Sequence, residues 1–163
     1  MQPIWELNIL NFKIGINVNN MLEIALGQYG IKEIAGKKHN PLVLRYFQET
    51  GHKWVHTDET AWCTAFVNWC AMKADKVYSN KLNARSYLAI GKSVRPPELG
   101  CIAILWRVHI TSWKGHVGFY IAEDEKYVYL LGGNQHNKVC IKPYPRNRVL
   151  GYRKLFGTSN AGE

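Results

Sequence analysis

Cys63 lies where a reactive cysteine would be expected. It falls in the first turn of a helix predicted over residues 61–74. Unpaired backbone amides and the positive end of the helix dipole favour a thiolate there, which lowers the thiol pKa and makes the sulfur a nucleophile. The same helix is apolar on two sides, and free cysteine is among the residue types most often buried in cores. Alone, Cys63 fits both a catalytic thiolate and a packed core residue.

His116 is the histidine best placed to act as a base for that thiolate. It opens a predicted strand, and Gly118, the next residue on the same strand face, leaves room for another element to approach. A strand histidine can equally be structural. Together with Cys63 it predicts covalent acyl transfer, in which a thiolate attacks an amide carbonyl and an imidazole moves the proton. The other histidines lie in polar loops, near helix ends or between strands: His39, His52, His56, His109 and His136.

The register of a predicted hairpin adds a third polar residue. If the strand from His116 turns at residues 124–126 and returns from Tyr127, His116 falls opposite Asn134. Opposed Cβ atoms lie roughly 4.5 to 5.5 Å apart, so the Asn134 amide oxygen would hold the imidazole in one tautomer. A two-residue loop would place Gly133 there instead, and Gly132 with Gly133 could form a bulge.

The elements that would position these residues are helices first and strands afterwards. Apolar spacing predicts helices from residue 20 to about 27–30, then over 42–49, 61–74 and 82–90. Asn40 and Pro41 would begin the second helix and Thr60 would cap the third. Strands are predicted at residues 101–106, 116–122, 127–131, 139–142 and 149–153, with a further one over 12–18. This order predicts an α+β fold with an antiparallel sheet of about five strands.

Composition indicates one globular domain with a basic surface. The 163 residues suit a single domain, and 47% apolar residues are enough for a core. A net charge of +9 favours anionic partners such as nucleic acid, acidic lipid or wall polymers, although the basic residues are scattered as on an ordinary solvated surface. No helix-turn-helix, zinc-finger or aromatic RNA-binding motif accompanies the charge, so nucleic-acid binding is not predicted.

Disulfides, metals and membrane spans are not predicted either. The four cysteines form no CxxC pair, and Cys63 and Cys70 lie about 10 Å apart along one helix. Among the six histidines, only His52 and His56 have the HxxxH spacing, and none belongs to an HExxH motif, so no metal is expected; the acyl-transfer chemistry needs no other cofactor. The chain shows no export signal and no run approaching the roughly 18 apolar residues of a membrane span. We therefore expect synthesis in the cytoplasm without a signal peptide, and no stable membrane insertion.

Three separated motifs together resemble a bacterial and phage branch of the NlpC and CHAP superfamily of cell-wall cysteine peptidases and amidases. They are DETAWCTAFVNWC at residues 58–70, GHVGF at 115–119 and GGNQ at 132–135, and the similarity covers about residues 22–152. Two positions depart from the family pattern. Gly132 stands where CHAP relatives often have an acidic residue, and Cys101 stands where relatives commonly have the aspartate of a Pro-Gly-Asp sequence.

The resemblance implies a papain-like fold whose nucleophile helix packs on the C-terminal sheet. The hydrolase domain would span residues 19–156, after an N-terminal extension (1–18) and before a flexible tail (157–163). The implied activity is cleavage of a peptidoglycan amide bond, as an N-acetylmuramoyl-L-alanine amidase or a peptide endopeptidase. Cys63 would be the nucleophile, His116 the base and Asn134 the orienting residue. The residues expected to line the cleft for the stem peptide are Glu59, Thr60, Trp62 and Gln135, and Trp62 fits a place in the core under the helix equally well.

The sequence is compatible with more than one biological setting. Without an export signal, a wall hydrolase would act in the periplasm or on the cell wall after phage lysis, or after dedicated secretion with an immunity or secretion-system partner. A phage-type lysin and a secreted antibacterial effector are both compatible. The alternative from another class is a non-catalytic wall-binding or interaction module of the same fold, and the complete Cys, His and Asn set favours the enzyme.

Overall fold

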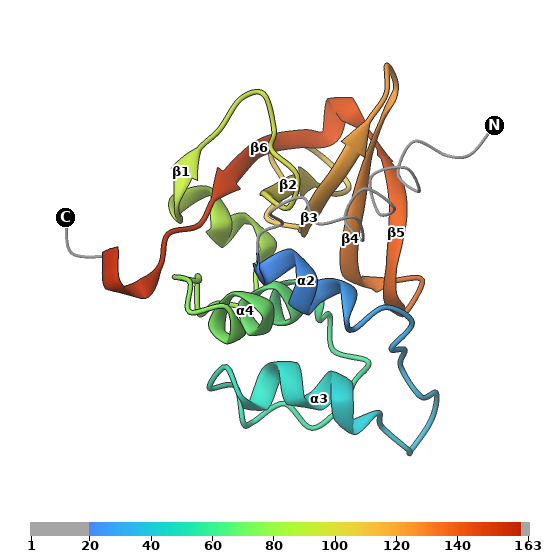
Figure 1. Ribbon diagram of the computed structural model, residues 1–163. Helices are drawn as coiled ribbons and strands as arrows, with labels where there is room; N and C mark the ends of the chain where they lie inside the picture. The colour runs from blue at the N-terminus through green and yellow to red at the C-terminus, as the bar shows by residue number, and fades with distance from the viewer. Residues whose placement is uncertain (1–19, 161–163) are drawn as a thin grey trace.

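The computed structural model describes residues 20–160, where α-helices gather on one side of a six-stranded antiparallel sheet (Figure 1). The helices are α2 (Asn20–Leu26), α3 (Pro41–Gln48), α4 (Cys63–Lys73) and the 3-10 helices η1 (Ala84–Ala89), η2 (Arg146–Arg148) and η3 (Thr158–Asn160). The strands are β1 (Lys92–Ser93), β2 (Ile102–Trp106), β3 (Gly115–Glu123), β4 (Tyr127–Gln135), β5 (Lys138–Pro145) and β6 (Val149–Lys154), in the spatial order β1-β6-β2-β3-β4-β5. The α+β class is confirmed.

The sheet has one strand more than the sequence predicted. The additional strand is β1, in which Lys92 pairs with Lys154 and Ser93 with Arg153 at the edge of β6. Its two residues are both exposed, so no apolar pattern marks it in the sequence. None of the helices within residues 20–160 is long and apolar enough to cross a membrane.

Helix α4 is the central element of the core. Every residue from Cys63 to Ala71 is buried, as its two apolar sides predicted. Phe66 packs edge-on against Phe119 of β3, with ring centroids 6.1 Å apart, and against Tyr46 of α3 at 5.3 Å. The helix thus lies between α3 and the sheet (Figure 1). Its first residue, Cys63, interacts with His116 and with the Val117 backbone on β3.

The helix starts were predicted correctly at α3 and incorrectly at α4. Asn40 caps α3, since its Oδ1 accepts a hydrogen bond of 2.9 Å from the Leu42 amide, with Pro41 following. Thr60 does not cap α4, which begins at Cys63 after Trp62 and has no side-chain cap. Trp62 has the non-helical backbone of an N-cap, with φ −117° and ψ 11°, and its indole N–H donates to Glu33 Oε1 at 2.7 Å. Cys63 is therefore the first helical residue.

The other expectations about elements have mixed outcomes. The helix predicted over 82–90 is the shorter 3-10 helix η1, which Asn83 caps by accepting from the Ser86 amide at 3.0 Å. At the start of the predicted tail, the Thr158 amide donates to the Asp75 carbonyl at 2.9 Å, so this part of residues 157–163 packs on the domain. The predicted strand at 12–18 and the extension at 1–18 lie outside the described residues.

A buried carboxylate, Asp58, holds the segment that leads into α4. It is fully buried and accepts hydrogen bonds from the amides of Ile34 at 2.9 Å and Asn40 at 2.8 Å. His39 Nδ1 lies 3.0 Å from its other oxygen. Burial raises the pKa of Asp58, but the hydrogen bonds from Asn40, Ile34 and His39 outweigh it and hold the pKa below its usual value. The folded protein therefore stabilises the ionised form of Asp58.

Replacing Asp58 should therefore lower stability in a pH-dependent way. A depressed folded pKa contributes stability above the unfolded value of about 3.9, and that contribution is lost as the pH falls through the folded pKa. We expect Asp58→Asn to lower the free energy of unfolding by about 1–3 kcal/mol at neutral pH. Urea unfolding of both proteins should show this difference shrinking below about pH 4. A difference that stays constant through the acid range would contradict the role of the charge.

The β3–β4 hairpin follows the predicted register over its middle part. Residues 124–126 form the connection, and the Asp124 carboxylate accepts from the amides of Lys126 and Tyr127, each at 2.8 Å. Next to this connection Glu123 pairs with Val128 and Ala122 with Tyr129, one residue off the predicted register. A register shift between Tyr120 and Ala122 then restores it, so that Tyr120 pairs with Leu130 and Phe119 with Leu131 as the sequence predicted.

A bulge in β4 changes what happens beyond Leu131. Pairing with β5 shifts between Gly132, which faces Cys140, and Gln135, which faces Lys138. Gly133 and Asn134 together oppose one residue of β5, and Asn134 adopts a left-handed φ of 55°. The inserted residue reverses the alternation of side chains, so Gln135 shares the face of Gly132. A Cβ on Gly132 would indeed lie 2.7 Å from Gln135 Oε1.

The glycine that admits helix α4 is Gly133. A Cβ there would lie 2.6 Å from a Trp62 ring carbon and 2.8 Å from Phe66 Cβ. The sequence predicted this role for Gly118, but a Cβ on Gly118 would instead meet the Leu131 carbonyl oxygen at 2.9 Å. What approaches Gly118 closely is therefore β4, and the helix rests on the bulge.

Gly133→Ala should destabilise the protein by overpacking the contact with α4. We expect a loss of about 1–3 kcal/mol in the free energy of unfolding, measured by urea denaturation. Gly151→Ala is the matched control, because the nearest atom to its Cβ is Leu88 Cδ2 at an ordinary 3.5 Å. Equal effects of the two substitutions would show that the helix does not depend on a bare backbone at Gly133.

Candidate catalytic site

Cys63 and His116 meet where the N-terminus of α4 reaches the sheet. Cys63 is 8% exposed and His116, the second residue of β3, is 5% exposed. The imidazole hydrogen-bonds the Cys63 thiol, and Thr64 Oγ1 lies 3.8 Å from the sulfur. The structure thus brings together the two residues that the sequence predicted as nucleophile and base.

The surroundings of Cys63 favour its thiolate. Burial raises the thiol pKa, but hydrogen bonding to His116 and its charge, with smaller contributions from Thr64 and the Val117 amide, bring the pKa below its ordinary value. Burial instead raises the pKa of Cys70 well above its usual value and that of Cys101 to about 12. Of these three thiols, Cys63 is the one whose pKa is lowered.

Gln135 holds the His116 ring. Its Oε1 lies 2.9 Å from His116 Nε2. Its Nε2 donates to the carbonyls of Leu130 at 3.1 Å and Cys140 at 2.6 Å, which fixes the amide with its oxygen toward the ring. Because an amide oxygen only accepts, the contact with Gln135 requires a proton on His116 Nε2, and Nδ1 is the ring nitrogen that remains for the Cys63 side chain.

Tyr144 of β5 covers the other side of this network. Its ring stacks on His116 with centroids 5.0 Å apart and an interplanar angle of 28°. Its hydroxyl donates to Gln135 Oε1 at 3.1 Å. Burial, followed by the Cys63 sulfur, raises the pKa of Tyr144 well above its usual value, so the phenol remains a donor. The sequence did not single out Tyr144.

The remaining predicted site residues lie in different surroundings. Asn134, predicted to orient the base, occupies the bulge, while the hydrogen bond to the imidazole comes from its neighbour Gln135. Gln135 and Trp62, predicted to line the cleft, are 1% and 0% exposed, and Trp62 packs against Tyr46 and Phe66 in the core. Glu59 is exposed and Thr60 partly exposed on the segment before α4, where they are accessible to a ligand.

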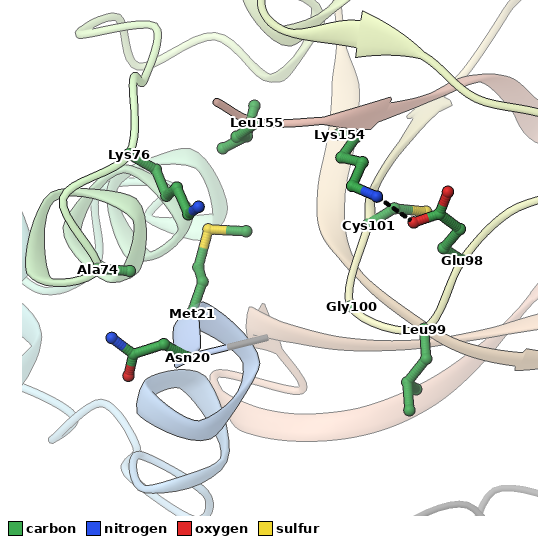
Figure 2. Close-up of a pocket in the computed structure, with 10 residues that line it drawn as sticks. All are labelled: Asn20, Met21, Ala74, Lys76, Glu98, Leu99, Gly100, Cys101, Lys154 and Leu155. Carbon is green, nitrogen blue, oxygen red and sulfur yellow. Dashed lines mark hydrogen bonds and ion pairs between the residues drawn. The ribbon is translucent and has the colours of Figure 1, made fainter. Parts of the chain in front are cut away.

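A pocket of about 540 Å³ lies away from these residues, between α2, the end of α4 and β6 (Figure 2). Figure 2 shows the Met21 side chain on one side and the ion pair of Lys154 with Glu98, 2.7 Å long, on the other. Its one thiol, Cys101, has a pKa raised to about 12 by burial, so it is not a nucleophile near neutral pH. The pocket contains neither Cys63 nor His116 and is not the catalytic site.

The depressed pKa of Cys63 predicts selective alkylation. At about pH 6, iodoacetamide should modify Cys63 well before Cys70 or Cys101, because only the thiolate reacts. Peptide mapping by mass spectrometry after short exposures would measure the rates, with urea-unfolded protein as the control in which the preference disappears. Similar rates for the three thiols in the folded protein would rule out a pre-activated Cys63.

A nucleophilic thiol, an imidazole and an orienting amide are the parts that covalent acyl transfer requires. The Cys63 backbone amide, at the start of α4, is suitably placed to stabilise an oxyanion. Neither the protein-family models nor the curated proteins with which the chain was compared give a match. The functional assignment therefore depends on the residues and geometry of this chain.

Proposed function

We propose that this chain is a papain-like cysteine hydrolase that cleaves an amide bond of the peptidoglycan stem peptide. The observation that carries the proposal is the Cys63 thiol, whose pKa is depressed by a histidine that Gln135 holds in one tautomer. A packed core cysteine has no need of an oriented imidazole, and Cys70, on the same helix, shows the raised pKa of such a residue.

The reaction would proceed by covalent catalysis. The Cys63 thiolate attacks the amide carbonyl, forming a sulfur–carbon bond and an oxyanion that the Cys63 amide stabilises. His116 gives its proton to the leaving amine as the carbon–nitrogen bond breaks. The imidazole then takes a proton from water, which attacks the thioester, releases the carboxylic acid and restores the thiol. Gln135 keeps the ring in place through both steps.

The choice of peptidoglycan as substrate is supported by the sequence. The motifs around Cys63, His116 and Gln135 resemble those of wall hydrolases in order and spacing. The net charge of +9 suits an anionic polymer. An N-acetylmuramoyl-L-alanine amidase and a peptide endopeptidase both fit this chemistry, and both a phage-type lysin and a secreted effector would act on the wall from the periplasm or from outside.

Mass spectrometry of fragments released from purified peptidoglycan tests the proposal. The wild-type protein should release soluble fragments whose new amino and carboxyl ends identify the cleaved bond, and Cys63→Ser should release none. Sedimentation with the wall without any fragment would instead support a non-catalytic wall-binding module. If the protein neither bound the wall nor released fragments, peptidoglycan would be excluded as its ligand.

A further inference from the structure

We infer that Arg107 and Lys142 form a carboxylate-binding subsite beside Cys63, so that the substrate carries a free carboxylate close to the amide that is cut. The inference rests on the proposed function, since it describes the substrate of the same site. It follows from strand register, ring contacts and the charges around the catalytic histidine.

Strand register places Arg107 on the sheet face of His116. In the β2–β3 ladder Leu105 pairs with His116, and the Arg107 amide continues the ladder by donating to the Lys114 carbonyl at 3.1 Å. Arg107 lies two residues beyond Leu105, and residues two apart on a strand share a face. Its side chain is exposed just beyond the end of β2, next to the start of β3, which carries His116.

Lys142 reaches the same place from β5. It lies two residues before Tyr144 and so shares its face, and its Nζ stands over the Tyr144 ring, 5.2 Å from the centroid. The same ring stacks on His116. Arg107 is close enough to Tyr144 to affect the pKa of its hydroxyl. Burial and the Cys63 sulfur raise this pKa, and the positive charge of Arg107 acts to lower it. Two cations are thus grouped around the side chain that covers the base.

Within residues 20–160, neither cation is neutralised by an ion pair. The basic residues that form ion pairs there are others: His39, Arg45, Lys73, Arg146 and Lys154. The sequence from Leu99 to Ala122, which carries Arg107 and His116, contains no Asp or Glu. Two uncompensated cations beside a nucleophile favour an anionic group on the ligand, and a carboxylate suits an arginine through bidentate hydrogen bonds.

Alkylation with a charged and a neutral reagent tests the subsite without a wall substrate. Iodoacetate carries a carboxylate and iodoacetamide does not, while both react with the same thiolate, so the ratio of their rates at Cys63 cancels any change in thiol pKa. Arg107→Gln should lower the iodoacetate-to-iodoacetamide ratio about threefold at low salt, and Lys142→Met should act in the same direction. High salt should reduce the difference by screening.

Arg95→Gln is the matched control, because it removes one positive charge from an exposed arginine that lies over Tyr152, on β6. Its rate ratio should equal that of the wild type. An unchanged ratio in both Arg107→Gln and Lys142→Met would overturn the subsite, as would an equal fall in Arg95→Gln, which would indicate only net charge.

A second arm connects the subsite to substrate. With wall peptides that differ only in a free or an amidated carboxylate, Arg107→Gln should raise KM for the free form about threefold and leave KM for the amidated form unchanged. Turnover of both forms with equal sensitivity to Arg107→Gln would overturn the inference. Absence of wall turnover together with an intact effect on the iodoacetate ratio would refute the proposed function and leave the anion subsite standing.

Discussion

Cys63→Ser is expected to abolish amide hydrolysis while leaving the protein folded. A serine hydroxyl has no thiolate-like population beside an imidazole arranged for a thiol, so the loss should be on the order of 10⁴-fold or more in kcat. The substitution is nearly isosteric, and the hydroxyl keeps hydrogen-bond partners in His116 and Thr64. Release of wall fragments measures the activity, and urea unfolding measures the stability of the same preparations.

Cys70→Ser is the control on the same helix. Cys70 is fully buried, and its raised pKa marks it as a neutral thiol. The new hydroxyl would cost about 1–3 kcal/mol of stability through burial of a polar group, but hydrolysis by the folded protein should persist. Equal activity in Cys63→Ser and Cys70→Ser, or a parallel loss of activity and stability in both, would exclude Cys63 as the nucleophile.

The sequence could predict the parts of this site that depend on local patterns. Cys63 follows a polar segment at the start of an apolar helix, and His116 begins a strand after a glycine. Both signals span few residues, and the structure joins the two side chains. The hairpin register was only partly local: next to the connection Glu123 pairs with Val128, and a register shift between Tyr120 and Ala122 brings Phe119 opposite Leu131.

The parts that were missed depend on contacts between distant segments. Gln135, and not the predicted Asn134, lies beside the imidazole because of the bulge in β4. Trp62 and Phe66 pack on Gly133 at this bulge. Residues 132 and 133 are both glycine, which permits a bulge. The sequence of β4 alone does not indicate whether Asn134 or Gln135 will face His116. The contact of Gly133 with Trp62 and Phe66, some 70 residues earlier in the chain, is not visible in the local sequence of β4.

The same reasoning applies to Thr60 and Tyr144. Thr60 has the side chain of a good cap, yet the helix starts at Cys63, directly after Trp62, whose indole is held by a long-range hydrogen bond to Glu33. Tyr144 becomes part of the site only through the β4–β5 pairing, which carries β5 alongside the bulge. Local propensity therefore predicted the existence of the elements, and tertiary contacts selected which of their residues form the site.

Gln135→Ala should lower hydrolysis about 100-fold or more, because the His116 ring would lose the acceptor that fixes its tautomer. Asn134→Gly should have little effect. Glycine retains the left-handed backbone at this position, so the variant removes only the amide side chain. The comparison separates the two neighbouring candidates, and kcat on wall fragments is the measurement.

A purely structural role for Gln135 must be distinguished from a positioning role, since its amide also donates to the Leu130 and Cys140 carbonyls. Loss of those bonds would lower stability without altering the thiol, whereas loss of the oriented imidazole should also move the pH midpoint of Cys63 alkylation upward. Gln135→Glu keeps an oxygen acceptor for His116 Nε2 but, like Gln135→Ala, loses the N–H donors to both carbonyls, so any activity that it recovers relative to Gln135→Ala would come from the contact with the imidazole. The orienting role would instead belong to Asn134 if Gln135→Ala left the pH midpoint of Cys63 alkylation unchanged, or if Asn134→Gly lowered hydrolysis more than Gln135→Ala does.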